Sequence, residues 1–127
     1  MQRWTFERRG AKALAARIDG AFEIDLALAP SQPLLLQGDA GFSRKGALEL
    51  HGSHYYSQPQ LAVQARLALG GGRHEGSGRA WLDHEWSDAL MPPEAVGWDW
   101  IGINGFDGSA LTAFRLRTAD GRALWAG

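Results

Sequence analysis

The chain has 127 residues, a formal net charge of -1 and no cysteine. This length suits one domain, and a hydrophobic content of 45% excludes global disorder. The charge balance argues against a nucleic-acid partner, and the lack of cysteine excludes disulfides and thiolate chemistry. No apolar run reaches the ~18 residues of a transmembrane helix, and no signal-peptide core is expected, so the compartment stays unknown.

The dominant hydrophobic period is two, which predicts strands with one buried face. The dipeptide Asp-Gly occurs three times between such runs and suits a two-residue hairpin turn. Residues 12–18 also have helical spacing, but a strand is favoured there because the run is short and ends at Asp19-Gly20. In chain order, hairpins are expected over residues 13–28, from 61–69 into 73–84, over 98–118 and over 111–126.

Other segments complete this expectation. Proline-containing loops are predicted at 31–33 and 91–93, because proline cannot donate to a strand ladder. The run 98–104 is apolar on both faces and is expected to be a central strand. About nine short strands result, which predicts an all-β fold, an antiparallel barrel or sandwich, with residues 1–127 as one domain.

The densest group of reactive side chains is the segment 80–88, with the sequence Ala-Trp-Leu-Asp-His-Glu-Trp-Ser-Asp. On a strand, Asp83 and Glu85 face one side while His84 and Trp86 face the other. A carboxylate pair two residues apart lies ~6.5–7 Å apart, which is suited to acid/base work such as glycoside hydrolysis. The alternative is a solvated acidic face with His84 packed beside Trp86.

A second group is Gly97-Trp98-Asp99-Trp100, in which the two tryptophans share a strand face. An acid among aromatic rings can have a raised pKa and act as a general acid. The alternative is a tryptophan pair in the core, with Asp99 exposed or paired with an arginine.

A third group, His51 to Ser57, places His54 and Tyr56 on one strand face and Tyr55 on the other. His51 and His54 lack a third ligand at a diagnostic spacing, so no metal is expected. Signatures of a zinc protease, a serine hydrolase elbow and a P-loop are absent from the sequence, and no cofactor is expected.

Four motifs in order resemble the carotenoid 1,2-hydratase (hydroxyneurosporene synthase)-like family, whose lipocalin-like bacterial members are often described as secreted hydrolases. They are Gln37–Gly46, Tyr55–Pro59, Ala80–Ser87 and Gly97–Trp100, and the tail Asp107–Arg117 fits as well. The resemblance implies a lipocalin-like β-domain. Family members have two such domains and are often exported, so this chain resembles a fragment whose open strand edges a homodimer would cover.

The resemblance also implies an activity. Such hydratases add water across a terminal double bond of an acyclic carotenoid, which calls for an acid and an aromatic-lined apolar pocket. The motifs implicate His84 and Trp86, and the remaining acid is open among Asp83, Glu85 and Asp99. The expected catalytic residues are therefore Asp83, His84, Glu85 and Asp99, and the expected substrate-binding residues are His54, Tyr55, Tyr56, Trp81, Trp86, Trp98 and Trp100.

Three functions are compatible with these residues. The first is an enzyme acting by acid/base chemistry on an apolar or ring-containing small molecule, by hydration or by hydrolysis of a glycosidic or ester bond. An esterase would need a nucleophile such as Ser53, Ser57 or Ser87 beside a histidine. The second is a lipocalin-like module that binds a hydrophobic ligand or sugar without turnover, and the third is a structural fragment.

Overall fold

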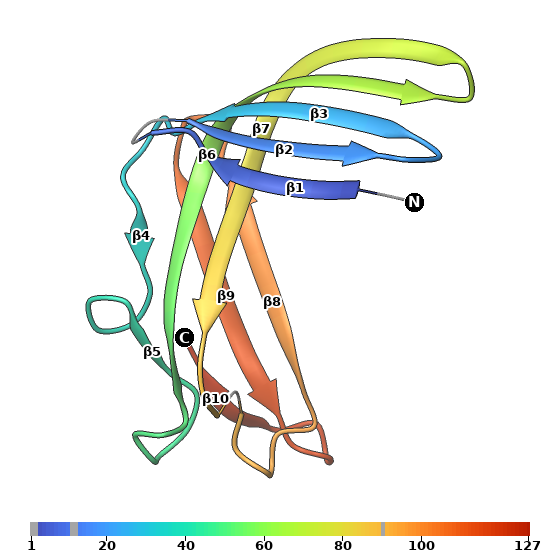
Figure 1. Cartoon of the computed structure of the whole chain (residues 1–127). Helices are drawn as coiled ribbons and strands as arrows, with labels where there is room; N and C mark the ends of the chain where they lie inside the picture. Colours follow the sequence, from blue (N-terminus) through green and yellow to red (C-terminus); the bar gives the residue numbers. More distant parts are fainter. Residues whose placement is uncertain (1–2, 11–12, 90) are drawn as a thin grey trace. The chain divides into compact units, whose positions relative to one another are not determined.

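The computed structural model of the chain describes residues 3–10, 13–89 and 91–127, and in these residues every regular element is a β-strand. Figure 1 shows the strands in chain order. They are β1 (Arg3–Arg8), β2 (Leu14–Asp19), β3 (Glu23–Ala29), β4 (Leu35–Leu36), β5 (Phe42–Arg44), β6 (Gly52–Leu69), β7 (Gly72–Trp86), β8 (Gly97–Asn104), β9 (Ala110–Arg117) and β10 (Ala123–Ala126). The predicted all-β class is confirmed, with ten strands where about nine were expected.

The chain divides into two compact units. The first comprises Met1–Pro33 and Gln60–Ala80, and in it β1, β2, β3 and the second half of β6 lie side by side. All their pairings are antiparallel, with Leu14 opposite Leu28 and Ile24 opposite Leu67. The expected hairpin over 13–28 is therefore confirmed, with a strand rather than a helix in its first arm.

A small apolar core explains this register. Leu14, Leu28, Leu61 and Val63 are the buried apolar side chains of the first unit, and Leu61 is only 1% exposed. Leu28, Leu61 and Val63 come from runs with a hydrophobic period of two, and the register of β2 sets Leu14 opposite Leu28, so strand pairing gathers these side chains on one face of the sheet.

The hairpin between β6 and β7 turns at Gly70 and Gly71, whose φ angles of 57° and 81° are readily adopted by glycine. The predicted hairpin is confirmed, but β6 is longer than the sequence indicated. It continues back through Pro59 and Gln60 to Gly52, and Gln60 has a positive φ of 53°. This irregular residue lies where the chain passes from the second unit into the first.

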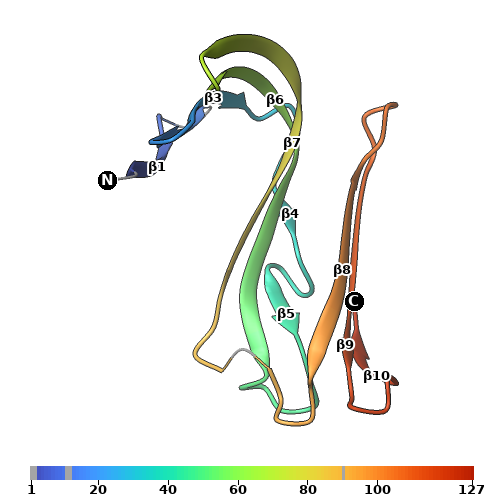
Figure 2. The same ribbon diagram turned by 90° about the vertical axis from the view of Figure 1, so that its right-hand side faces the viewer.

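The second unit comprises Leu34–Pro59 and Trp81–Gly127. In it, β4 and β5 both pair with the first half of β6, with Leu35 opposite Ser57 and Phe42 opposite His54. A separate three-stranded antiparallel sheet has the order β10-β9-β8. Figure 2 shows β8 and β9 as a long hairpin, so the hairpins expected over 98–118 and 111–126 are confirmed.

One expectation about this sheet is wrong. The run 98–104 was expected to be a central strand, but β8 lies at the edge of its sheet, and β9 is central. Ile101 and Ile103 are about half exposed. The segments at 31–33 and 91–93 are loops as predicted. Within the described ranges, the structure contains no helix that is long and apolar enough to cross a membrane.

Candidate functional site

A tight turn between β4 and β5 begins the site. Asp39 and Phe42 exchange backbone hydrogen bonds of 3.0 and 2.8 Å, and Gly38 and Gly41 have φ angles of 63° and 97°. These glycines adopt a left-handed backbone that other residues adopt only at a cost. The turn reverses the chain, so that Lys45, one residue beyond β5, lies beside the paired strands.

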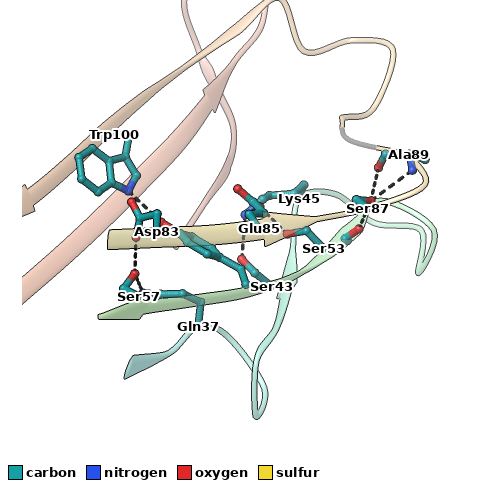
Figure 3. Close-up of polar contacts among 12 residues, drawn as sticks. Gln37, Ser43, Lys45, Ser53, Ser57, Asp83, Glu85, Ser87, Ala89 and Trp100 are labelled. Atoms are coloured by element: carbon teal, nitrogen blue, oxygen red, sulfur yellow. Dashed lines mark hydrogen bonds and ion pairs between the residues drawn. The ribbon is translucent and has the colours of Figure 1, made fainter. Parts of the chain in front are cut away.

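Strand alternation produces a row of polar contacts on one face of β6 and β7 (Figure 3). Ser57 donates a 2.5 Å hydrogen bond to Asp83 and accepts one of 3.0 Å from Gln37, while Ser53 donates to Glu85. Both serine side chains are buried. The predicted placement of Asp83 and Glu85 on a common face is therefore seen, and buried hydroxyls hold both carboxylates.

Lys45 forms the charged end of this row. Its side chain is only 8% exposed, and its amine lies 2.9 Å from Glu85 and donates a 2.9 Å hydrogen bond to Ser43. A buried ammonium needs such partners, since an unpaired buried charge is very costly. Glu85 thus accepts bonds from both a buried amine and a buried hydroxyl.

These residues border a cavity of about 110 Å³. Its walls are mainly apolar and aromatic, from β6, β8, β9 and the loop before β8, and Lys45 and Glu85 supply its charged groups. The lining residues are Lys45, Tyr55, Glu85, Met91, Trp98, Trp100, Phe114 and Leu116. An apolar pocket with a few convergent polar groups is the usual form of a small-molecule site.

Two tryptophans are fixed by hydrogen bonds near this cavity. Trp100 donates a 3.1 Å bond from its indole nitrogen to the phenol oxygen of Tyr55, and Trp81 donates a 2.7 Å bond to Asp83. Burial raises the pKa of the Tyr55 phenol above its ordinary 10.0, and the negative charge of Asp83 adds to the rise. Tyr55 therefore keeps its proton at neutral pH.

The opposite face of β6 and β7 carries a different row, made of rings. Tyr56 stacks on His84 with centroids 5.3 Å apart, and His54 stacks on Trp86 at 5.4 Å. His84 also contacts Trp86 edge to face. This row therefore lies on the face opposite Asp83 and Glu85, and it consists of His54, Tyr56, His84 and Trp86. The packing of His84 beside Trp86 matches the alternative in which His84 is a packed side chain and not a catalytic one.

Asp99 is also separated from the cavity. Its carboxylate lies 2.6 Å from Arg115 and 3.1 Å from Arg117, while its neighbours Trp98 and Trp100 line the cavity from the other face of β8. The hydrogen bond from Arg115, with the attraction of Arg117, lowers the pKa of Asp99 below its ordinary 3.8. Of the two alternatives for Asp99, the structure shows the carboxylate paired with arginines, and it does not show an acid whose pKa is raised by aromatic rings.

The hydroxyls of Ser53, Ser57 and Ser87 do not donate to a histidine. Ser53 and Ser57 donate to carboxylates, and Ser87 donates a 2.5 Å bond to the backbone oxygen of Gly52. None of these bonds is the serine–histidine contact that the esterase alternative requires. Among residues 3–10, 13–89 and 91–127, no cluster of three or more His, Asp or Glu side chains could hold a metal ion.

Lys45 and Phe114 were missed as site residues. Lys45 lies inside the Gln37–Gly46 motif, which marks the segment but gives the lysine no role. Its amine lies 4.1 Å from the centre of the Phe114 ring, a contact between segments far apart in sequence. In the sequence, Lys45 is only a lysine between two short strand-like runs, and that pattern is typical of a solvated loop.

Comparison with known proteins places this site in a family context. The model of the AttH-like family matches residues 1–127. A crystal structure of a Nitrosomonas europaea protein provisionally named AttH is 45% identical, with a TM-score of 0.92 over 97% of this chain. The match covers 39% of that protein, so the chain spans about two fifths of its length. No curated protein matches the chain.

These findings agree with the motif resemblance at a coarser level. AttH-like proteins are lipocalin-like and related to carotenoid hydratases. The lipocalin-like, all-β class is therefore right, while the narrower carotenoid 1,2-hydratase-like assignment stays a prediction.

Proposed function

The chain belongs to the AttH-like family, and on that premise we propose that its second unit binds the ring or the branched end of an apolar small molecule. The observation that carries this proposal is the aromatic-walled cavity of about 110 Å³ between Tyr55, Trp98, Trp100 and Phe114. An engineered apolar cavity of about 150 Å³ holds benzene. A similar but open cavity is suited to one ring, or to one end of a longer molecule.

Binding can be tested with α-methylstyrene, a single-ring probe with a branched alkene, followed through the indole N–H signals of the tryptophans in NMR spectra. Trp98 and Trp86 offer a matched pair, since they are 57% and 50% exposed and only Trp98 lines the cavity. Covering ~40 Å² of apolar surface contributes about 1 kcal/mol, or about fivefold in affinity. Trp98→Ala should therefore weaken binding about fivefold, and Trp86→Ala should leave it unchanged.

Loss of binding in Trp86→Ala but not in Trp98→Ala would contradict this site. A probe that shifts none of the indole signals of Trp98 and Trp100 at saturation would contradict the proposal itself. The ring row of Tyr56, His84 and Trp86 would then be the better candidate surface.

A second candidate function is catalysis on the same molecule, favoured by the carboxylate of Glu85 in the cavity wall. In alkene hydration, an acid protonates the terminal carbon, water adds to the resulting cation, and a base takes one proton from that water. Electron-rich ring faces stabilise such a cation, and Trp98, Trp100 and Phe114 supply them. We favour Asp83 and Glu85 as the acid and the base, since the raised pKa of the Tyr55 phenol makes it a poor proton donor to an alkene.

Turnover is tested with the same probe, whose hydration product is 2-phenylpropan-2-ol. We expect Glu85→Gln and Asp83→Asn to lower its rate of formation, and Asp99→Asn, which alters a carboxylate outside the cavity, to retain it. Absence of product with the unmodified protein would leave ligand binding as the function of this site. Release of p-nitrophenol from a p-nitrophenyl glycoside or ester would instead favour hydrolysis.

A further inference from the structure

Lys45 is the feature of the cavity that neither the binding nor the catalytic proposal uses. The residue is only 6% exposed, yet its amine borders an apolar cavity. A protonated amine carries three N–H donors and no acceptor. Glu85 and Ser43 take two of them, each at 2.9 Å.

The Lys45 amine also lies beside two aromatic rings. The Lys45 nitrogen lies 4.1 Å from the centre of the Phe114 ring and 5.1 Å from that of Tyr55. Both rings line the cavity. A ring face is a weaker acceptor than an oxygen atom, so an oxygen placed in the cavity would offer the third donor a better partner.

We propose that the ligand of this cavity carries a neutral carbonyl or hydroxyl oxygen beside its apolar group, and that Lys45 donates a hydrogen bond to this oxygen. The inference rests on the proposed function, since it names the chemical class of the molecule bound there. Lys45 acts as the specificity-determining residue. A hydrocarbon of the same shape offers the third N–H of Lys45 no oxygen, so this N–H contacts only the aromatic rings.

The charge of the pair favours a neutral oxygen over a carboxylate. Glu85 already balances the charge of Lys45 at 2.9 Å. A ligand carboxylate would stand close to the Glu85 carboxylate, whose side chain is 30% exposed, so water screens the repulsion between the two like charges only in part. An anionic ligand is therefore disfavoured, although a lysine borders the site.

Two isosteric probes separate the oxygen from the shape. Acetophenone and α-methylstyrene share a ring and a methyl group, and differ by C=O in place of C=CH2. A net hydrogen bond contributes about 1 kcal/mol, or about fivefold in affinity. Acetophenone should therefore bind about fivefold more tightly than α-methylstyrene in NMR titrations of the Trp98 and Trp100 indoles, and benzoate should bind more weakly than acetophenone.

A variant that removes the donor completes the test. Lys45→Met with Glu85→Gln deletes the amine without leaving an unpaired carboxylate beside the cavity, and acetophenone and α-methylstyrene should then bind with about equal affinity. Ser43→Ala, which retains the amine, should keep the preference. The comparison of the two probes on the unmodified protein decides the question even if the double variant fails to fold.

The outcomes separate the two proposals. Equal affinity for both probes overturns the role of Lys45 and leaves the apolar site standing. Tighter binding of benzoate than of acetophenone overturns the preference for a neutral oxygen. Absence of binding by every probe overturns the proposed function itself.

Discussion

Tyr55 connects two strands of the second unit through a single phenol oxygen. Its ring belongs to β6, and its oxygen accepts the indole N–H of Trp100 from β8. Because its side chain is buried near Asp83, the ionised phenol is disfavoured in the folded protein. This one residue therefore reports on whether the cavity is assembled.

Titration of the phenols tests this arrangement. The chain has two tyrosines, and the folded pKa of Tyr55 lies above the ordinary 10.0. The stabilising contribution is complete below pH 10 and is lost as the pH rises through the folded pKa. Absorbance at 295 nm should show a late-titrating phenol that Tyr55→Phe removes and Tyr56→Phe retains. Removal of that phenol by Tyr56→Phe would contradict the burial of Tyr55.

At the scale of elements, local pattern accounts for most of what could be predicted. Alternation and Asp-Gly turns concern neighbours in sequence, so the hairpins were correctly placed. The partners of Lys45 and Asp99 depend on pairing between distant segments, which one sequence does not specify. Asp99 was correctly assigned to the face opposite Trp98 and Trp100. Pairing of Asp99 with an arginine, one of the two alternatives that the sequence left open, is the one observed, and the β8–β9 register determines that Arg115 is a partner.

The turn after β4 allows a matched pair of glycine substitutions. Gly38 and Gly70 both have a positive φ, of 63° and 57°. A Cβ at Gly38 would collide with the backbone of Phe42, while one at Gly70 meets open space. Gly38→Ala should lower the free energy of unfolding by roughly 1 kcal/mol more than Gly70→Ala, measured by urea denaturation. Equal losses would show that the turn shifts to admit the side chain.

Asp99 in the β8–β9 hairpin should make the stability of the protein depend on pH in the acid range. Asp99 has a lowered pKa in the folded protein, so its contribution to stability is present above about pH 4 and is lost as the pH falls through the folded pKa. Asp99→Asn should flatten the decline of the urea midpoint with acid pH. It should leave probe binding unchanged, because this side chain is outside the cavity lining. An unchanged acid decline would mean that other carboxylates cause it.

At the scale of the whole molecule, β6 and β7 are the strands shared by the two compact units. The order of the strands leaves β1 and β8 at sheet edges, and both carry exposed apolar residues, including Trp4, Phe6 and Ile101. Exposed edges of this kind favour pairing with another chain. Homodimerisation through strand edges therefore stays a prediction, as does the treatment of residues 1–127 as one domain.

Sedimentation equilibrium tests the dimer. The chain mass is 13.8 kDa, and we expect twice that mass at micromolar concentration. Phe6→Lys places a charge on the β1 edge and should shift the equilibrium toward the monomer, while Ile101→Lys tests the β8 edge in the same way. A monomer at all concentrations would contradict the prediction. Loss of the dimer in one variant alone would identify the edge that pairs.

The alternation of side chains along β6 and β7 has a consequence for engineering. Positions 55, 83 and 85 project toward the cavity side, while 54, 56, 84 and 86 form the ring row. A library that randomises only the second set alters the outer surface and leaves the recognition chemistry intact. A library that randomises only positions 55, 83 and 85 alters the recognition chemistry and leaves the outer surface intact. The two strands therefore encode two surfaces that selection can change separately.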